Sequence, residues 1–324
     1  YSTKYAYEVS SLYSMDEYEG PLEKLVHPAG MKLFGSKVHE GYVYRPEWTM
    51  PDQNDTVDDI SPSGNAANNF MSPAWSRDGT KLAYTKAVIP GGSVADQNAR
   101  GIHTSTASGA SEVQHTNGYG DNNPRWNHDG TFVVYAGVDG NNDKQIYKLE
   151  VSSSTSTQLT SGLYDSYSPD WSPDGNQIIF VTDKDGVYRQ DLYGMDTSGG
   201  SLIKLITGKV LSPRFSPDGT EIVFTERKAT SPWRDTQKEI YKRKNDGTVV
   251  RLTHNEGAVD TGQAYENRTP ADVWGDNYDP SWSSDGNYII FTTRRGPEYV
   301  DQLFIMRSDG SDQRPIFTNP DFNI

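Results

Sequence analysis

The chain of 324 residues contains no cysteine, which excludes disulfide bonds, a thiol nucleophile and zinc sites built on thiolates. It also has no run of about 18 apolar residues, so we expect no membrane span. Basic residues are scarce, because 30 Lys and Arg stand against 44 Asp and Glu for a net charge of −14. No basic stripe offsets this charge, and we therefore expect no nucleic-acid partner.

The residues that are abundant indicate a turn-rich β protein. The chain has 30 Gly, 18 Pro and 20 Tyr, and its hydrophobic share of 34% is enough for a buried core. An eight-residue phrase with a proline, an aromatic residue and a final Asp-Gly recurs along the chain. Its five versions are SPAWSRDG (72–79), NPRWNHDG (123–130), SPDWSPDG (168–175), SPRFSPDG (212–219) and DPSWSSDG (279–286).

Each phrase leads into a run of β-branched and aromatic residues, such as EIVFTE at 221–226. An Asp-Gly turn between two apolar runs predicts a β-hairpin. A second hairpin follows in each unit, as in DLYGMDTSGGSLIKLITG at 191–208. Four strands per unit predict the blade of a β-propeller.

The two ends of the chain suggest how the ring closes. Residues 2–7 resemble 79–84, and residues 12–26 resemble 192–206, so the chain opens on a blade that lacks its first strand. Residues 319–324 resemble SPDWSP and are predicted to supply that strand. We therefore predict an all-β, six-bladed propeller, closed by the C-terminal strand joining the N-terminal blade, with residues 1–324 as a single domain. The predicted blade markers are Trp75, Trp126, Trp171, Phe215, Trp282 and Phe322.

The pattern PxWSPDGxxIxF, followed by a second hairpin, resembles the WD40-like repeat of TolB-type β-propellers. Proteins with such propellers include the Tol-Pal periplasmic scaffold, the gating domains of tricorn-like and prolyl peptidases, and the oligogalacturonate lyase family. The resemblance implies a bacterial, periplasmic or secreted protein. It implies no single activity, because one fold carries many functions.

Tracing the strands assigns the connections to two ends of the ring. The short turns within hairpins fall at one end, the turn end, which we predict to be structural. The loops 28–71 and 254–278 fall at the other, the long-loop end, and long loops in a compact domain are often functional. Aromatic and arginine side chains there are typical of sites that stack on sugars or anchor peptides. The predicted ligand-binding residues are Tyr42, Tyr44, Arg45, Trp48, Trp233, Arg234, Arg268, Trp274, Tyr278, Arg294 and Arg295.

The leading interpretation is a monomeric binding module for a glycan or for a protein or peptide at the long-loop end. One alternative is a carbohydrate-active enzyme, either a polysaccharide lyase or a glycoside hydrolase, at the same end. A lyase needs a base beside the uronate carboxylate and a cation that neutralises this carboxylate. The candidate catalytic residues are His39, His254, Tyr278 and Arg294. A third alternative is an interaction subunit of an envelope complex.

No cofactor is required by these interpretations, and calcium is the one candidate. Acidic turns place oxygen ligands at alternate positions, as a calcium loop does. The residues concerned are Asp139, Asn141, Asp143, Asp183 and Asp185. The competing interpretation is that these side chains bond their own backbone in turns.

The position between the proline and the aromatic residue of each phrase is predicted to line the central channel. Charges of alternating sign there predict ion pairs that plug the channel. The positions are Ala74, Arg125, Asp170, Arg214, Ser281 and Asp321.

Overall fold

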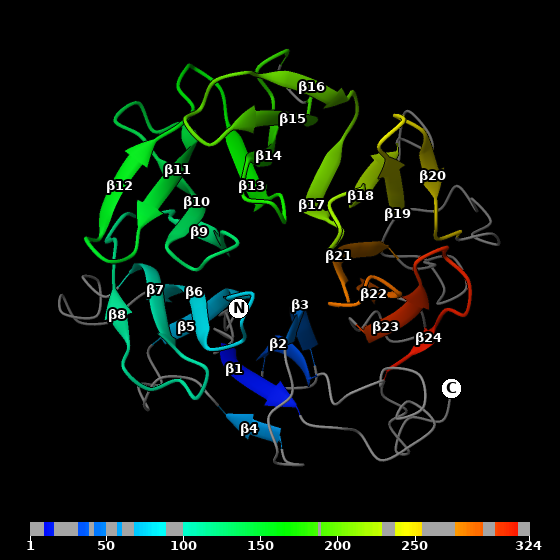
Figure 1. Ribbon diagram of the computed structural model, residues 1–324, viewed down its shortest axis with the longest axis horizontal. Helices are drawn as coiled ribbons and strands as arrows, with labels where there is room; N and C mark the ends of the chain where they lie inside the picture. The colour runs from blue at the N-terminus through cyan, green and yellow to red at the C-terminus, as the bar shows by residue number, and fades with distance from the viewer. Residues whose placement is uncertain are drawn as a thin grey trace, which may run out of the picture.

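A computed structural model of the chain describes residues 10–15, 32–38, 42–49, 57–59, 68–88, 100–186, 189–228, 237–254, 276–293 and 302–316. Every regular element in these ranges is a β-strand. Consequently, the described part contains no helix that could cross a membrane. The strands form four-stranded antiparallel sheets arranged as a ring (Figure 1).

Five sheets are blades of the predicted repeat, each with its four strands hydrogen-bonded in chain order. Blade 1 contains β5 (Asn68–Trp75), β6 (Lys81–Val88), β7 (Gly101–Thr106) and β8 (Val113–Gln114). Blade 2 contains β9 (Asn122–Trp126), β10 (Phe132–Val138), β11 (Lys144–Glu150) and β12 (Thr155–Gln158). Blade 3 contains β13 (Ser166–Trp171), β14 (Gln177–Thr182), β15 (Asp191–Asp196) and β16 (Ile203–Ile206).

The last two blades follow the same order. Blade 4 contains β17 (Val210–Phe215), β18 (Glu221–Lys228), β19 (Gln237–Lys244) and β20 (Val249–Arg251). Blade 5 contains β21 (Asn277–Trp282), β22 (Tyr288–Thr293), β23 (Gln302–Arg307) and β24 (Arg314–Pro315). The first strand of each blade is the innermost, and neighbouring inner strands contact one another around the ring.

The sixth place in the ring is filled differently from our prediction. Its sheet contains β1 (Ser10–Met15), β2 (Lys32–Val38), β3 (Tyr42–Thr49) and β4 (Val57–Asp59) in the order β3-β2-β1-β4. The inner strand is β3, which contacts β21 on one side and β5 on the other. The structure thus has five blades of the predicted order, so the prediction of six such blades is wrong, and residues 319–324, predicted to supply the closing strand, lie outside the described residues.

The sequence of β3 explains why it takes this position. Arg45-Pro46-Glu47-Trp48 matches the proline and aromatic spacing of the five inner strands. The register between β2 and β3 also shifts opposite Arg45 and Pro46, at the same place as in the five blades. The prediction of a loop over residues 28–71 is therefore wrong, because β2, β3 and β4 lie within it. Phe322 and the rest of the C-terminal segment lie outside the described residues.

The proline of each inner strand sits at a β-bulge. Proline has no N–H to donate to the second strand, so it is tolerated where the ladder is interrupted. The residue before it adopts a left-handed conformation, with φ between 48° and 55°, which Ser, Asn and Asp enter more readily than other residues. These residues are Ser72, Asn123, Ser168, Ser212 and Asp279. The bulges recur at the same level in all five blades.

The Asp-Gly turn after each inner strand is held by its own side chains, as blade 4 shows. Ser216 Oγ donates to Asp218 Oδ1 at 2.6 Å and accepts from the backbone N–H of Glu221 at 2.9 Å. The hydrogen bond from Ser216 lowers the pKa of Asp218. Gly219 follows at φ 73°, where a side chain would be strained. The same arrangement closes the turns of blades 1, 3 and 5.

An aromatic pair joins the second and third strands of every blade. The pairs have ring centroids 5.4–6.3 Å apart and are Tyr84–His103, Tyr135–Tyr147, Phe180–Tyr193, Phe224–Tyr241 and Phe291–Phe304. In blade 1 a histidine takes the aromatic position, and its Nδ1 lies 2.9 Å from Glu112 Oε1. Tyr84 Oη donates to the same carboxylate at 2.9 Å, and Lys86 Nζ lies 3.1 Å from it. His103 is thus part of a buried structural cluster.

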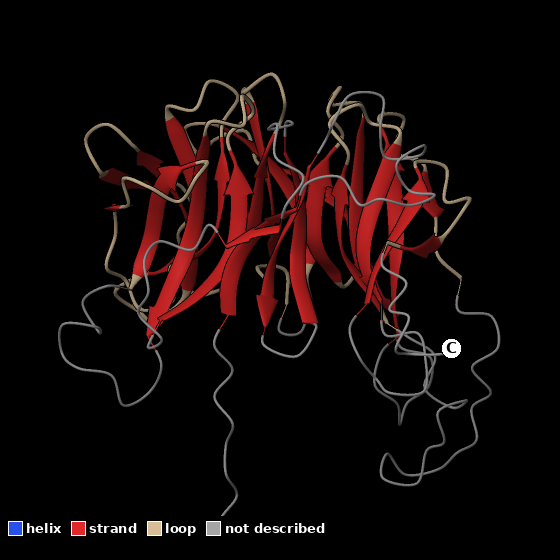
Figure 2. Ribbon diagram, turned by 90° about the horizontal axis from the view of Figure 1, so that it is seen from below, coloured by secondary structure: helices blue, strands red, loops and turns tan. Residues whose placement is uncertain are grey.

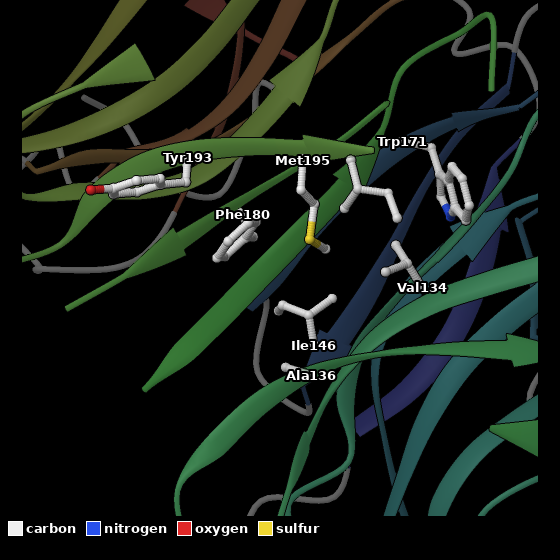
Figure 3. Packing of buried hydrophobic residues seen from close by; sticks show 8 residues of the cluster. Val134, Ala136, Ile146, Trp171, Phe180, Tyr193 and Met195 are labelled. Carbon is white, nitrogen blue, oxygen red and sulfur yellow. The ribbon is translucent and has the colours of Figure 1, made fainter. Parts of the chain in front are cut away.

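The hydrophobic core lies between the blades rather than inside them. Val134, Ala136 and Ile146 of blade 2 pack against Trp171 and Phe180 of blade 3 (Figure 3). Equivalent clusters join blades 1 and 2, blades 3 and 4, and blades 4 and 5. Each blade therefore depends on its neighbours for burial of its apolar faces.

Truncating the core between blades tests this dependence. Phe180 is 1% exposed, so Phe180→Ala is expected to lower the free energy of unfolding by about 3–5 kcal/mol, through lost burial and a cavity. Leu163, which is 86% exposed, supplies the matched control, and Leu163→Ala is expected to cost less than about 0.5 kcal/mol. The measurement is equilibrium denaturation in urea. Equal effects of the two changes would contradict the packing described.

The carboxylate beside His103 makes stability depend on pH. Burial alone would raise the pKa of Glu112, but the hydrogen bond and charge of His103, aided by Lys86, prevail and lower it from 4.5 to about 2. A depressed pKa in the folded state stabilises the fold above the ordinary pKa, and this stability is lost as the pH falls through about 2.

Replacing this carboxylate by an amide tests the pH dependence. Glu112→Gln is expected to lower the free energy of unfolding by about 1–3 kcal/mol at pH 7, with the deficit shrinking as the pH approaches 2. Glu150→Gln, which alters an exposed side chain, is the control. Urea denaturation at a series of pH values measures both. A deficit that stays constant down to pH 2 would refute the assignment.

Candidate functional site

A pocket of about 450 Å³ opens on the axis of the ring at the turn end. The inner strands of all five blades and the turns that follow them supply its walls (Figure 1). The strands run between the two ends of the ring (Figure 2). The lining includes Ala74, Arg125, Asp170, Arg214 and Ser281.

These five residues are the positions that the sequence predicts to line the channel. Arg125 and Arg214 are only 5% and 9% exposed. Arg125 Nη1 donates to the carbonyl oxygens of Pro73 and Pro124 at 3.1 and 3.0 Å. These bonds tie the guanidinium to the bulged inner strands of two adjacent blades.

Blades 3 and 4 are joined through Asp170, while a hydrogen bond of Arg214 lies within its own strand. Arg214 Nη1 donates to the Pro213 carbonyl at 2.7 Å. Asp170 Oδ2 accepts the backbone N–H of Phe215 at 2.9 Å. Open space remains beside these residues, so they do not close the channel as the predicted ion pairs would.

The rim of the pocket combines aromatic and proline residues with exposed side chains of the turns. Trp75, Trp126, Trp171, Phe215 and Trp282 surround the opening. Arg77 and His128 extend from the turns of blades 1 and 2 and are exposed.

The turns also touch one another around the rim. A Cβ on Gly219 would lie 3.4 Å from Pro173 Cδ, and one on Gly286 would lie 3.7 Å from Pro217 Cδ. A side-chain carbon would thus be in ordinary contact with the neighbouring turn, and the turn conformation with its positive φ is what favours glycine.

The described lining carries an excess of positive charge. The lining contains three arginines, Arg77, Arg125 and Arg214. Asp170 is the single carboxylate among the described residues of the pocket. Since the whole chain has a net charge of −14, this local excess marks the pocket as unlike the rest of the surface. Such a surface suits a negatively charged ligand with apolar parts.

The residues predicted to bind a ligand at the long-loop end have separate positions. Tyr42, Tyr44, Arg45 and Trp48 belong to the inner strand β3, whose backbone alone is described, and not to a loop. Six other predicted ligand-binding residues and the catalytic candidate His39 lie outside the described residues. The six are Trp233, Arg234, Arg268, Trp274, Arg294 and Arg295. The prediction for these seven residues stays a prediction.

Two catalytic candidates are described, and both lie away from the pocket. His254 is exposed just after β20. Tyr278 lies near the start of β21, half-buried, with Lys238 Nζ 4.8 Å from its ring centroid. The catalytic roles of His254 and Tyr278 stay predictions.

The calcium candidates are engaged in turns and ion pairs. Asp139 Oδ1 accepts the backbone N–H groups of Asn141 and Asp143 at 2.8 and 3.1 Å. Asp185 accepts a hydrogen bond from Tyr193 Oη and pairs with Lys184 and Lys204. Asp183 Oδ1 accepts the backbone N–H of Asp165 at 2.8 Å. In the described part of the chain no three His, Asp or Glu side chains gather as a metal site would need.

Arg77 and His128 at the rim are not among the predicted site residues, because the turn end is predicted to be structural. Arg77 and His128 occupy the turn positions of Pro173 and Pro217 in the repeat. A departure from the repeat at the same turn position in two neighbouring blades was the available signal.

Comparisons with known proteins agree with the fold. Residues 62–257 match the model of the TolB beta propeller domain family. The uncharacterized peptidase YuxL of Bacillus subtilis (strain 168) is 29% identical over 189 residues, which cover 52% of this chain and 29% of that protein. The match thus spans under a third of that relative.

Two solved structures show the same architecture. A putative TolB from Agrobacterium tumefaciens has a TM-score of 0.62 and 19% identity, covering 96% of this chain and 89% of its own. Oligogalacturonate lyase from Vibrio parahaemolyticus has a TM-score of 0.55 and 12% identity, covering 84% of this chain and 74% of its own. At such identities these likenesses concern the fold alone. The family model, however, spans more than half of the chain and all of blades 1 to 4, and the chain therefore belongs to the TolB β-propeller domain family.

Proposed function

We propose that this chain is a binding propeller that recognises a segment of a partner protein at the pocket on the turn end. The observation that carries the proposal is the pocket itself, about 450 Å³ in volume and bounded by the inner strands of five blades. It is too small for a folded domain and of the size that accommodates a few side chains. A peptide segment can enter it while the rest of the partner lies on the surrounding turns.

The chemistry of the pocket favours an acidic segment with aromatic or aliphatic residues. The half-buried lining residues Trp75, Phe215, Pro173 and Pro217 offer apolar surface to such residues. Arg77 is exposed at the rim, and the described part of the structure places no carboxylate against it. A charged rim attracts a segment of opposite sign and discriminates against basic ones.

The likeness to TolB supports a partner that is a protein. It also supports a periplasmic or secreted location, and we propose both for this chain, which we take to act as a monomer. The glycan and lyase alternatives depend on residues at the long-loop end, most of which lie outside the described part. No described contact favours them over peptide binding.

Selection from a random peptide library displayed on phage tests the proposal. Panning on the immobilised chain at physiological salt is expected to enrich peptides that combine Asp or Glu with aromatic residues. An enriched peptide, labelled with fluorescein, then gives the dissociation constant by anisotropy. Enrichment of basic peptides, or of none, would argue against the proposed recognition.

Two variants locate the binding of that peptide. Arg77→Glu reverses a rim charge and is expected to weaken binding about tenfold. Ser284→Trp adds bulk at an exposed lining position and is expected to weaken it further. Lys244→Glu makes the same charge reversal at an exposed position on the outer part of blade 4 and should leave binding unchanged. Equal binding by all three variants would place the peptide elsewhere.

A further inference from the structure

A second pocket, of about 460 Å³, lies between blades 3 and 4 at the long-loop end. Its residues come from the strand ends that lie opposite the Asp-Gly turns, so it is separate from the pocket at the turn end. They are Lys144, Asp165, Tyr167, Asp183, Arg189, Gln190, Lys209 and Arg227. No residue of this set was among the predicted ligand-binding positions, and the proposed peptide site does not use it.

Backbone hydrogen bonds fix the walls of this pocket. Gln190 and Lys209 form an isolated parallel bridge, in which Val210 N–H donates to the Gln190 carbonyl at 2.9 Å. Arg227 N–H donates to the Lys209 carbonyl at 2.9 Å. The connection between blades 3 and 4 is thereby held against the end of β18, and Lys209 and Arg227 are brought side by side.

The aromatic wall is also held in place. Burial raises the pKa of Tyr167 to about 12, and its hydroxyl is hydrogen-bonded with Gln190. Lys144 Nζ lies 5.9 Å from the centroid of the Tyr167 ring. The pocket therefore offers a fixed aromatic edge beside its charged groups.

The charges of the pocket are unbalanced. Four cationic side chains face two carboxylates. Asp165 Oδ1 already accepts the backbone N–H of Lys144 at 2.9 Å, and Asp183 Oδ1 accepts that of Asp165 at 2.8 Å. Each acid is thus partly occupied by the backbone, while the pocket keeps a net positive charge in a chain of −14.

Among the described residues, only one of the four cations has an ion pair with a carboxylate. Arg189 reaches Asp191, at 3.6 Å, but among the described residues no carboxylate pairs with Lys209 or Arg227. Arg227 Nε is buried and makes no hydrogen bond within the described structure. A buried donor without a partner is costly and rare in folded proteins, and a bound acceptor is a common reason for one.

We propose that this pocket binds a small organic anion through a carboxylate or phosphate group held by Arg227 and Lys209. A guanidinium beside an ammonium suits the oxygens of either group. The volume of about 460 Å³ lies in the range of small-molecule sites and exceeds what a bare ion fills. The body of the ligand would lie along Tyr167 and Gln190.

Isothermal titration calorimetry of the full chain in an oxyanion-free buffer tests the proposal. The probes are citrate for a carboxylate, glucose 6-phosphate for an organic phosphate, inorganic phosphate for the bare ion, and glucose as the neutral comparison. We expect saturable binding of citrate or glucose 6-phosphate, stronger than that of inorganic phosphate and weakened by added salt. Which of the two binds identifies the anionic group.

Variants assign the binding to this pocket. Arg227→Gln and, separately, Lys209→Gln are each expected to weaken binding about tenfold or more. Arg227→Lys keeps the charge and serves where the first variant fails to fold. Lys244→Gln removes an exposed cation at the opposite end of blade 4 and should bind as the parent does. Absence of saturable binding by every probe, equal binding of inorganic phosphate, or unchanged binding by folded Arg227 and Lys209 variants would overturn the proposal.

Discussion

The packing of each blade against the next is the interaction on which the ring depends. A four-stranded sheet of this kind has two apolar faces, and it buries them only when a neighbour stands on either side. The bulge at the proline of each inner strand directs the following aromatic residue into that contact, as Trp171 does between blades 2 and 3. An open place in the ring would leave blades 1 and 5 each with an uncovered face, so the fold requires a sixth sheet of some kind.

This requirement explains which part of the fold the sequence could predict. The hairpin phrases predict five blades, because turn chemistry and strand periodicity are local. Closure is not local, since main-chain hydrogen bonds accept any extended segment that reaches the gap. Residues 319–324 resemble the repeat and therefore predict the closing strand. Arg45-Pro46-Glu47-Trp48 has the same spacing within a stretch predicted to be a loop, and only the structure shows that it forms an inner strand with the bulge.

The candidate sites show the same division between repeated and unrepeated features. Arg125, Asp170 and Arg214 could be predicted to line the axis because they share one position of the repeat. Whether these side chains close the central channel depends on their geometry, which the sequence does not give. In the structure they bond to proline carbonyls and to the Phe215 amide, and a pocket remains beside them. The pocket between blades 3 and 4 had no signal at all, since its cations occupy different positions of different units.

Both pockets are basic although the chain is strongly acidic, and the reason lies in how charge is distributed. Many carboxylates serve the turns, where hydroxyl and backbone groups bind them and lower their pKa, as with Asp174 and Asp218. Those charges lie toward solvent, where salt screens them over about 8 Å. Arg125 and Arg214, in contrast, are buried in the wall of the turn-end pocket, where screening is weaker and their field is stronger. The net charge of the chain therefore governs encounters at long range, whereas the few cations inside each hollow decide what stays bound.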